Sequence, residues 1–371
     1  MAMEFPHEVL LPHKTICRKG SVSQIARESL EFGMRGLIVH GHSLEEDGKR
    51  EKIVDQFPPG ATVESYCRGS GEPTLDEVAE AIEKAKAVKA EWVVGIGGGS
   101  VLDLAKASAG LVNAKEKAIY YQEGGELKER GVPFIAVPTT AGTGSETTPN
   151  AVITNKEKKT KLSIRDKSFL ARTVILDVEL LKGLPHSIMS CAAMDALVQG
   201  YESFISKNAT WFSETFALKS IDLINKNILP ACSARTEENL SALLIGSYYA
   251  GIGLAASRLG VIHGIAHPLG ALYNIAHGLI CSVCFTPSIK LNREVMGNKY
   301  DVMSSIVGMD FLERAEMLME ALRIISPFKG KTVIEKEKII TETLQSGSTA
   351  ANPKQIDRTD VEFILAEVFA P

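Results

Sequence analysis

The stretch Gly95-Ile-Gly-Gly-Gly-Ser-Val-Leu-Asp-Leu-Ala-Lys106 decides the fold of this 371-residue chain. It follows an apolar run, Glu91–Ile96, that predicts a strand, and it leads into a helix. Glycines let the backbone approach a pyrophosphate, and the next helix offers unpaired N–H groups and the positive end of its dipole. A tight turn needs glycine anyway, but a Gly-Gly-Gly-Ser run followed by Asp103 exceeds what a turn requires. We therefore predict a dinucleotide-binding loop with contacts from Gly97, Gly98, Gly99, Ser100 and Asp103.

Apolar runs and helical segments alternate along the first half of the chain. Further strands are predicted at Gly36–His40, Val132–Val137 and Thr173–Asp177. Leu75–Lys89 carries apolar residues at helical spacing. Because uniformly apolar strands are typical of a parallel sheet covered on both faces, an α/β fold is favoured.

The character of the sequence changes after Leu184-Pro185, where strand-like runs largely disappear. Helices are predicted at Met189–Ser206, Trp211–Asn227, Glu237–Ser257 and Phe311–Ile325, with a smaller helical subregion at Lys329–Pro371. We therefore expect an α/β dinucleotide-binding domain with a parallel sheet at residues 1–185 and an all-α domain at residues 186–371.

A second polar loop, Pro138–Glu146, follows the strand predicted at 132–137 and is rich in hydroxyl groups. Ligands of open parallel sheets bind outside the carboxyl ends of the strands, where both loops fall. Helix capping accounts for Ser145 or Thr143 but hardly for all the hydroxyls. The predicted cofactor contacts from this loop are Thr139, Thr140 and Thr143.

Three of the eight histidines are clustered, at His263, His267 and His277. They lie in a stretch, Leu259–Ile289, that contains no Asp, Glu, Lys or Arg, so the rings are expected to be buried. A single buried histidine is usually a hydrogen-bonded core residue, whereas a buried cluster needs partners or a metal. Asp195, with Gln199 one helical turn later, is the natural carboxylate complement for Zn²⁺ or Fe²⁺.

Several classes of protein are disfavoured by composition. A net charge of −4 does not indicate the positively charged surface that nucleic-acid binding requires. Six scattered cysteines and the lack of an apolar signal core at the N-terminus favour a reducing, cytoplasmic location. Leu259–Ile289 is long enough to cross a membrane, but its histidines, glycines and Pro268 fit buried helices better. Cys281 and Cys284 have no second ligand pair at zinc-site spacing, so we assign both to a helix core.

Together these motifs resemble the iron-containing, metal-dependent alcohol dehydrogenase family, from the first strands to about Asn292. The shared marks are Gly97-Gly-Gly-Ser-x-x-Asp103, Pro138-Thr-Thr-x-Gly-Thr-Gly-Ser-Glu146, Asp195-Ala-Leu, and His263-x-x-x-His267-Pro-Leu-Gly with His277-Gly278. The resemblance implies a dehydroquinate synthase-like fold, with a dinucleotide-binding domain, a helical domain and a cleft between them. It also implies an NAD or NADP cofactor, a homodimer or larger homo-oligomer, and a divalent metal held by one Asp and three His.

The metal ligands depart from the family pattern at one position. The residue four after the Asp is normally His in the family and is Gln199 here, whereas Asp195, His263 and His277 match. An amide oxygen is a weaker donor than imidazole for Fe²⁺ or Zn²⁺. The resemblance therefore implies a site that binds its metal less tightly than is usual in the family, similar to the Asp/His/His site of zinc glycerol dehydrogenases. Either Zn²⁺ or Fe²⁺ fits such a site.

The implied reaction is reversible hydride transfer between NAD(P) and an alcohol, aldehyde or ketone, with the metal acting as a Lewis acid on the substrate oxygen. His267 matches a family position near substrate and cofactor and joins Asp195 and His277 as the expected catalytic residues. Two alternatives stay open. Gln199 favours a metal-independent reductase resembling maleylacetate reductases, although Asp195 argues against it. A nucleotide-binding protein that has lost catalysis is disfavoured because three metal-type residues survive as well as both loops.

The strand Gly36–His40 is expected to end near the adenosine ribose. NAD-specific enzymes place an acidic residue at such a strand end, commonly Asp in this family. Here Gly41 occupies that position, His42 and Ser43 can donate hydrogen bonds to a 2′-phosphate, and Lys49 or Arg50 adds positive charge if the loop folds back. We therefore predict NADP in preference to NAD, and we assign Lys161 to the same cofactor-binding set.

Overall fold

A computed structural model describes residues 8–370 of the chain, which separate into two compact units. The sheet unit comprises Leu10–Thr140 and Ser145–Gly183. The helical unit comprises the described residues from Leu184 onward together with Ala141–Gly144 and residues 8–9. Each unit is described by itself.

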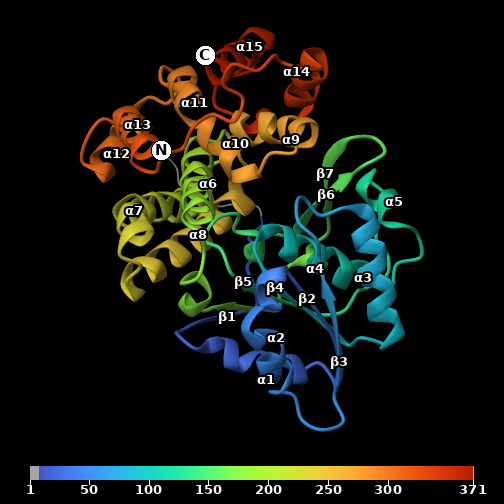
Figure 1. The fold of residues 1–371 in the computed structure, drawn as a ribbon. Helices are drawn as coiled ribbons and strands as arrows, with labels where there is room; N and C mark the ends of the chain where they lie inside the picture. The colour runs from blue at the N-terminus through green and yellow to red at the C-terminus, as the bar shows by residue number, and fades with distance from the viewer. Residues whose placement is uncertain (1–7, 371) are drawn as a thin grey trace. The chain divides into compact units, whose positions relative to one another are not determined.

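The sheet unit is built on six parallel strands in the order β1–β8–β5–β4–β2–β3 (Figure 1). The strands are β1 (Lys14–Cys17), β2 (Arg35–His40), β3 (Thr62–Cys67), β4 (Trp92–Gly97), β5 (Phe134–Pro138) and β8 (Thr173–Leu176). The four strands predicted from apolar runs are confirmed as β2, β4, β5 and β8. A separate antiparallel hairpin joins β6 (Asn150–Asn155) to β7 (Thr160–Arg165).

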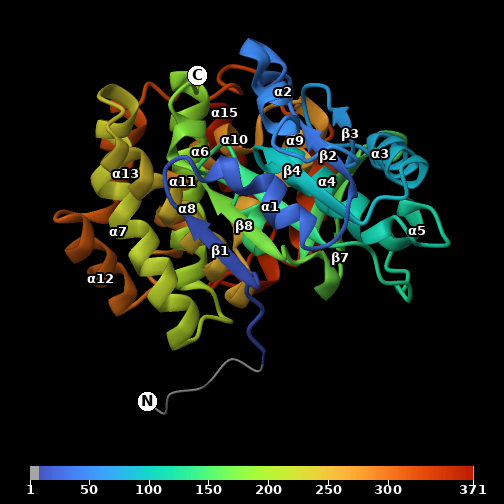
Figure 2. The same ribbon diagram turned by 90° about the horizontal axis from the view of Figure 1, so that it is seen from below.

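Helices cover both faces of this sheet, as the uniformly apolar strands predict. The helices of the unit are α1 (Ile25–Leu30), α2 (Lys49–Val54), α3 (Leu75–Ala87), α4 (Gly99–Leu111) and α5 (Ala118–Gln122). On one face, helix α1 lies over the sheet (Figure 2). Its Ile25 belongs to a core with Ile38 and Val94. On the other face, α4 lies so close to β4 that a Cβ at Gly95 would be 2.8 Å from the Cβ of Ala105.

The strand order reverses between β2 and β4, because β3 lies on the far side of β2 although it precedes β4 in the chain. Ligands of doubly wound sheets bind outside the carboxyl ends of the strands at such a point. The register pairs His40 with Ile96 and Gly97 with Pro138. The ends of β2, β4 and β5, and the loops that follow them, therefore lie side by side at one edge of the sheet.

The helical unit contains ten α-helices among its described residues. They are α6 (His186–Ile205), α7 (Trp211–Ser233), α8 (Glu237–Ser257), α9 (Val261–Tyr273), α10 (His277–Val283), α11 (Phe285–Asn292), α12 (Asn298–Val307), α13 (Phe311–Ala321), α14 (Lys336–Gln345) and α15 (Arg358–Phe369). The longest three, α6, α7 and α8, pack against one another, and α14 and α15 confirm the helical tail (Figure 1).

The sequence offered one segment of this unit, Leu259–Ile289, as long enough to cross a membrane. The charge-free stretch Leu259–Ile289 folds into α9, α10 and part of α11, none of which has the length of a membrane span. Among the described residues, only α8 is long and apolar enough to qualify, and 56% of its apolar window is buried within the protein. A largely buried helix of a folded unit accounts for that composition.

Candidate metal centre and cofactor-binding loops

Helix α6 carries Asp195 and Gln199 one turn apart on the same face. The Gln199 Nε2 donates a hydrogen bond of 3.1 Å to Asp195 Oδ2. Both side chains are buried, at 1% and 2% exposure. The other oxygen of Asp195 and the amide oxygen of Gln199 have no hydrogen-bond partner among the described residues. Because a buried acceptor without a donor is costly, this pair of oxygens suits a bound cation.

Helix α9 supplies His263, whose ring is held by Glu202 of α6. The Glu202 Oε2 lies 2.7 Å from His263 Nδ1, and Oε1 accepts a 2.7 Å hydrogen bond from the Ile262 N–H. Glu202 is fully buried, so both bonds are formed away from water. A carboxylate on Nδ1 fixes the ring and leaves Nε2 as the donor toward a metal. That Nε2 faces Asp195 Oδ1 at 3.5 Å.

Helix α10 supplies His277 and, one turn later, Cys281. The Cys281 Sγ lies 3.5 Å from His277 Nε2 and 3.8 Å from His263 Nε2. Gly278 allows α10 to approach α6 this closely, because a Cβ at that position would be 2.7 Å from the Cys191 carbonyl oxygen. The family-type His277-Gly278 pair therefore has a packing reason as well as a chemical one.

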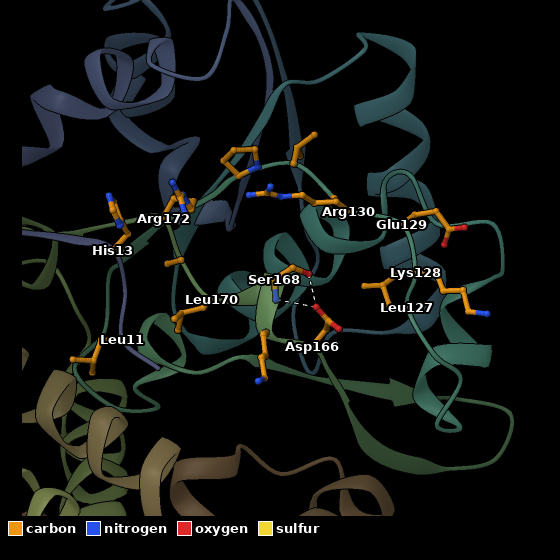
Figure 3. Close-up of a pocket in the computed structure, with 15 residues that line it drawn as sticks. Leu11, His13, Leu127, Lys128, Glu129, Arg130, Asp166, Ser168, Leu170 and Arg172 are labelled. Carbon is orange, nitrogen blue, oxygen red and sulfur yellow. Dashed lines mark hydrogen bonds between the residues drawn. The ribbon is translucent and has the colours of Figure 1, made fainter. Parts of the chain in front are cut away.

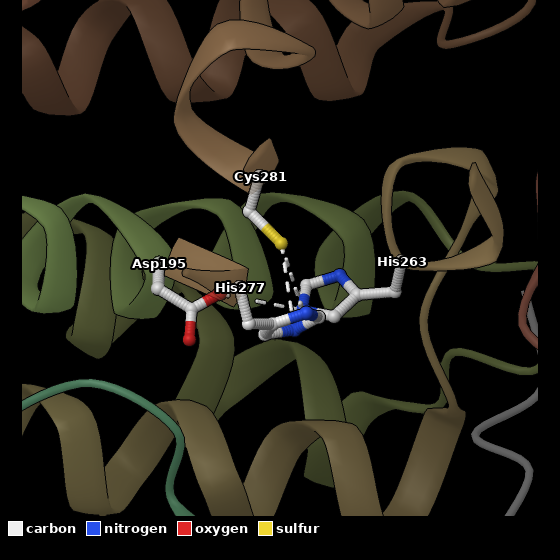
Figure 4. Close-up of side chains that lie close together, drawn as sticks. All are labelled: Asp195, His263, His277 and Cys281. Atoms are coloured by element: carbon white, nitrogen blue, oxygen red, sulfur yellow. Dashed lines mark hydrogen bonds and ion pairs between the residues drawn. The ribbon is translucent and has the colours of Figure 1, made fainter. Parts of the chain in front are cut away.

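Figure 4 shows Asp195, His263, His277 and Cys281 converging from three helices. Their ligand atoms all lie within 4.8 Å of one another, and these four residues form the donor cluster. Burial opposes protonation of His263, but Cys281, Asp195 and Glu202 outweigh it and hold the pKa of that ring well above its ordinary value. Burial raises the pKa of the Cys281 thiol to about 12. A divalent cation that binds here would displace the protons of the His263 ring and the Cys281 thiol.

The cysteines were predicted to lie in a buried core, and the structure adds a contact for one of them. Cys281 and Cys284 are both buried, as a helix core requires, but Cys281 also lies in the donor cluster. The spacing of the cysteines does not reveal this place of Cys281, because its partners Asp195 and His263 come from α6 and α9 and not from a second nearby Cys or His pair. The four-residue spacing from His277 to Cys281, the same as from His263 to His267, was the available signal.

His267 lies one turn after His263 on α9 and is half-buried. Its ring centroid is 5.8 Å from that of His277, with an interplanar angle of 34°. It therefore borders the donor cluster without belonging to it, which suits a group that handles protons or orients a ligand beside a metal.

At the edge of the sheet, β4 turns directly into α4 through Gly97, Gly98 and Gly99. A Cβ at Gly97 would be 2.5 Å from the Val101 Cβ, so only glycine fits there. A Cβ at Gly98 would be 3.2 Å from Thr140 Oγ1. The Thr139 N–H donates a 3.0 Å hydrogen bond to the Gly97 carbonyl, which joins the loop after β5 to the glycine loop. The first turn of α4, including Ser100, presents its N–H groups at this edge.

Asp103 of α4 is engaged within the protein. Its Oδ1 accepts a 2.5 Å hydrogen bond from Ser145 Oγ, and its Oδ2 accepts a 3.0 Å bond from the Val152 N–H. Beneath it the buried Lys106 Nζ donates to Ser145, Thr148 and the Asn150 carbonyl. Asp103 thereby anchors α4 to the segment that follows the second loop.

Burial dominates the titration of this network. Burial raises the pKa of Asp103 above its ordinary value. Burial lowers the pKa of Lys106 to about 8 and raises that of Glu146 to about 7. Charges are therefore costly here, and each charged group depends on its neighbours for compensation.

Gly41 follows β2 and begins a short turn, His42–Leu44. Its φ of −91° and ψ of 170° are open to any residue, and a Cβ there would make an ordinary 3.6 Å contact with Val101. The His42 Nδ1 lies 3.5 Å from the Cys67 Sγ at the end of β3. Ser43 lies within the same turn and is exposed.

The same strand end also holds a charge pair that the sequence did not predict. The Arg50 Nε lies 3.5 Å from Glu45 Oε1, and its Nη1 donates a 3.3 Å hydrogen bond to Ser65 Oγ. The Glu45 carboxylate turns back to within 3.3 Å of His40 Nε2. His40, Glu45 and Cys67 lie close enough to hold a metal, but the guanidinium of Arg50 already compensates Glu45. The end of β2 therefore has both a positive charge, Arg50, and a negative charge, Glu45, beside it.

Two other predicted cofactor residues have separate surroundings. Thr143 belongs to Ala141–Gly144, which clusters with the helical unit, whereas Thr139 and Thr140 belong to the sheet unit. Lys161 of β7 is buried, and its Nζ lies 2.8 Å from Glu72 Oε1.

A cavity of about 560 Å³ lies in the sheet unit (Figure 3). Its lining includes His13, Pro133 and Arg172, which immediately precede β1, β5 and β8. It therefore lies at the amino ends of the parallel strands, opposite to the edge that carries the glycine loop. This cavity is not where a dinucleotide bound to that loop would lie.

The comparisons with known proteins agree with this arrangement. The family model described as iron-containing alcohol dehydrogenase matches residues 12–178, and that of the Fe-containing alcohol dehydrogenase family, C-terminal, matches residues 189–369. The chain is 28% identical to the lactaldehyde reductase of Escherichia coli (strain K12) over 361 residues, 92% of this chain and 94% of that protein. It is 33% identical to the NAD-dependent methanol dehydrogenase of Bacillus methanolicus over 278 residues, 74% and 72% of the two chains.

Solved structures show the same fold. A 1,3-propanediol oxidoreductase superposes with a TM-score of 0.89 at 25% identity, covering 99% of this chain and 100% of that one. The sulfoacetaldehyde reductase from Bifidobacterium kashiwanohense, in complex with NAD⁺, gives a TM-score of 0.89 at 23% identity and covers 98% of each chain.

A glycine loop at the switch point of a parallel sheet, next in sequence to a helical unit with a buried carboxylate–imidazole cluster, is the arrangement expected of a dinucleotide-binding enzyme that uses a metal. The chain belongs to the iron-containing alcohol dehydrogenase family and is an enzyme of the alcohol dehydrogenase kind. Membership implies a divalent metal, a nicotinamide cofactor and a small alcohol or aldehyde as substrate.

Proposed function

We propose that this enzyme catalyses reversible hydride transfer between NADP(H) and a small primary or secondary alcohol with its aldehyde or ketone, using a divalent metal held by Asp195, His263 and His277. The observation that carries the proposal is the convergence of these donors, with Glu202 on His263 Nδ1 at 2.7 Å. That contact orients Nε2 toward Asp195, as a carboxylate behind a metal-binding histidine does in metal sites generally. The Asp195 Oδ1, which accepts no hydrogen bond from the described residues, fits the same cation.

The metal, when bound, supplies Lewis-acid polarisation of the substrate oxygen, worth several kcal/mol, while the nicotinamide carries the hydride. The chain supplies position and charge. Gly98, Gly99 and Ser100 would hold the pyrophosphate through N–H groups at the start of α4. Thr139 and Thr140 would add hydroxyls from the neighbouring loop, and Thr143 and Lys161 remain predicted contacts. His267, half-buried beside His277, would pass a proton between the substrate oxygen and solvent.

NADP is proposed in preference to NAD because Gly41 leaves room for a 2′-phosphate and Arg50 stands at the same strand end. His42 and Ser43 would donate hydrogen bonds to that phosphate. One observation favours NAD instead, because the Glu45 carboxylate lies beside His40 and Arg50 and would repel a phosphate. Its ion pair with Arg50 compensates that repulsion in the proposal.

A metal-independent reductase is the second candidate function, and Gln199 is the observation that favours it. Its amide nitrogen donates to Asp195 at 3.1 Å, which stabilises the carboxylate without a metal. Metal analysis of protein purified without chelator separates the two functions, because the first requires about one divalent ion per chain and the second requires none.

We also propose a cytoplasmic location and a homodimer or larger homo-oligomer. All six cysteines are free thiols, which suits a reducing compartment. The oligomer is proposed from the family resemblance.

The activity is tested by a screen of short aldehydes, ketones and diols, each measured with NADPH and with NADH. We expect turnover of at least one class, faster with NADPH. Cofactor binding without turnover of any member would instead support a nucleotide-binding protein that has lost this catalysis.

A further inference from the structure

The spacing of the donor atoms in the helical unit matches a tetrahedral zinc site that includes sulfur. Zinc bonds of about 2.0–2.3 Å place tetrahedral ligand atoms roughly 3.3–3.8 Å apart. The Cys281 Sγ is 3.5 Å from His277 Nε2 and 3.8 Å from His263 Nε2. His263 Nε2 is 3.5 Å from Asp195 Oδ1, the buried oxygen without a hydrogen bond. Three edges of the expected tetrahedron are therefore already in place.

We propose that Cys281 replaces the histidine that Gln199 has displaced, so that the metal is bound by Asp195, His263, His277 and Cys281. This inference rests on the proposed metal-assisted function and assigns the ligand which that function lacks. These four side chains would fill a tetrahedral shell, so a substrate oxygen would join the metal as a fifth ligand, an expansion that catalytic zinc sites undergo. Gln199 contributes indirectly, because its amide nitrogen is bonded to Asp195 Oδ2 and positions the carboxylate.

A sulfur ligand also decides between the two candidate metals. Thiolate is a soft donor that favours Zn²⁺ over Fe²⁺, and Zn²⁺ binds more tightly than Fe²⁺ to a given set of nitrogen, oxygen and sulfur donors. The site is therefore a zinc site in this chain. On metal binding, the thiol proton leaves to solvent and the sulfur binds as thiolate.

Cys284 provides a matched control within the same segment. It is as buried as Cys281 and lies three residues further along the chain, but it is outside the donor cluster. Serine at either position makes the same conservative change of sulfur to oxygen. Loss of metal at one position and not the other therefore separates coordination from packing.

The decisive experiment loads the full-length protein with Co²⁺ as a spectroscopic substitute for Zn²⁺. A cysteine ligand gives a sulfur-to-cobalt charge-transfer band in the near ultraviolet, and we expect that band at one Co²⁺ per chain. The band should persist in Cys284→Ser and vanish in Cys281→Ser, with Zn²⁺ affinity reduced by about 100-fold or more, since outer-shell changes alone cost 10–100-fold. Adding Gln199→His to Cys281→Ser should restore affinity without restoring the band.

Stoichiometric Co²⁺ binding by the unmodified protein without the sulfur band would overturn the assignment, whatever the variants do. So would the absence of any metal binding, which would also favour the metal-independent reductase. If the band is present and no alcohol or aldehyde is turned over, the ligand assignment stands and the proposed reaction fails.

Discussion

His277 begins α10, and its Nε2 lies beside Cys281 Sγ. It is one of the three residues of the donor cluster that the sequence also predicted as metal ligands. Replacing it with alanine removes one of the two imidazole nitrogens in the donor cluster. We predict that His277→Ala protein retains less than about a tenth of the metal content after dialysis, because even outer-shell changes cost 10–100-fold in affinity. His186→Ala, an exposed histidine at the start of α6, is the control and should change nothing. Equal metal content in the two variants would show that the metal does not bind at His277.

Gly41 governs the cofactor prediction. Because its backbone is ordinary and a Cβ there meets only Val101 at 3.6 Å, Gly41→Asp should fold normally. The new carboxylate would repel a 2′-phosphate and accept a hydrogen bond from a ribose 2′-OH. We predict that the ratio of kcat/KM for NADPH to that for NADH falls by about tenfold or more, since like charges in contact cost several kcal/mol.

The control for this variant is Gly183→Asp, which adds the same charge at a position with nothing within 4 Å. The ratio should not change there. An advantage for NADH in the unmodified protein would show that Glu45, and not Arg50, governs the cofactor at this strand end.

The outcome at single residues shows what sequence can locate. Asp195, His263 and His277 were predicted as ligands from their residue types and order, and the structure brings their ligand atoms within 4.8 Å of one another, while their role as ligands stays a prediction. Glu202 and Cys281 were missed because their importance depends on neighbours: each contacts His263, and only the packing of α6, α9 and α10 creates those contacts. The charge pair between Glu45 and Arg50 was missed for the same reason.

At the scale of elements, the junction of β4 and α4 is the feature on which cofactor binding depends. Gly98→Val would place methyl groups in the space that phosphate oxygens must occupy and would press on Thr140 at about 3.2 Å. We predict a loss of cofactor affinity of about 100-fold or more, measured by titration calorimetry, with an unchanged far-ultraviolet circular dichroism spectrum. Gly183→Val should bind normally. Normal cofactor affinity in Gly98→Val would show that this loop does not hold the pyrophosphate.

The strands divide into those that sequence predicted and those it did not. The central strands β4, β5 and β8 are buried on both faces and read as unbroken apolar runs. The edge strands β1 and β3 carry polar residues because they are partly exposed, and they did not stand out from loops. The hairpin of β6 and β7 was missed because polar residues interrupt both strands, so neither is an unbroken apolar run.

At the scale of the whole molecule, buried charge under the glycine loop links stability to pH. The pKa of Glu146 is about 7 in the folded chain because of burial, and 4.5 is its ordinary value. The folded state therefore binds an extra proton between these values, and the free energy of unfolding falls as pH rises from about 4.5 to about 7. The loss is on the order of 3 kcal/mol, at about 1.4 kcal/mol per pKa unit.

Glu146→Gln stays neutral and should not lose this stability. We predict that the free energy of unfolding of the metal-free variant, measured with denaturant, exceeds that of the metal-free unmodified chain by a growing amount as the pH rises through that range. Parallel curves would mean that the carboxyl group titrates near its ordinary value.

The central claim is that this enzyme reduces and oxidises its substrate with the help of a divalent metal in the helical unit. The most direct test measures NADPH oxidation by an accepted aldehyde before chelation, after removal of the metal, and after addition of one equivalent of Zn²⁺. The account predicts that activity falls by at least about 100-fold on removal and returns on addition, since Lewis-acid assistance is worth several kcal/mol. Full activity in metal-free protein would contradict it and would establish the metal-independent reductase that Gln199 favours.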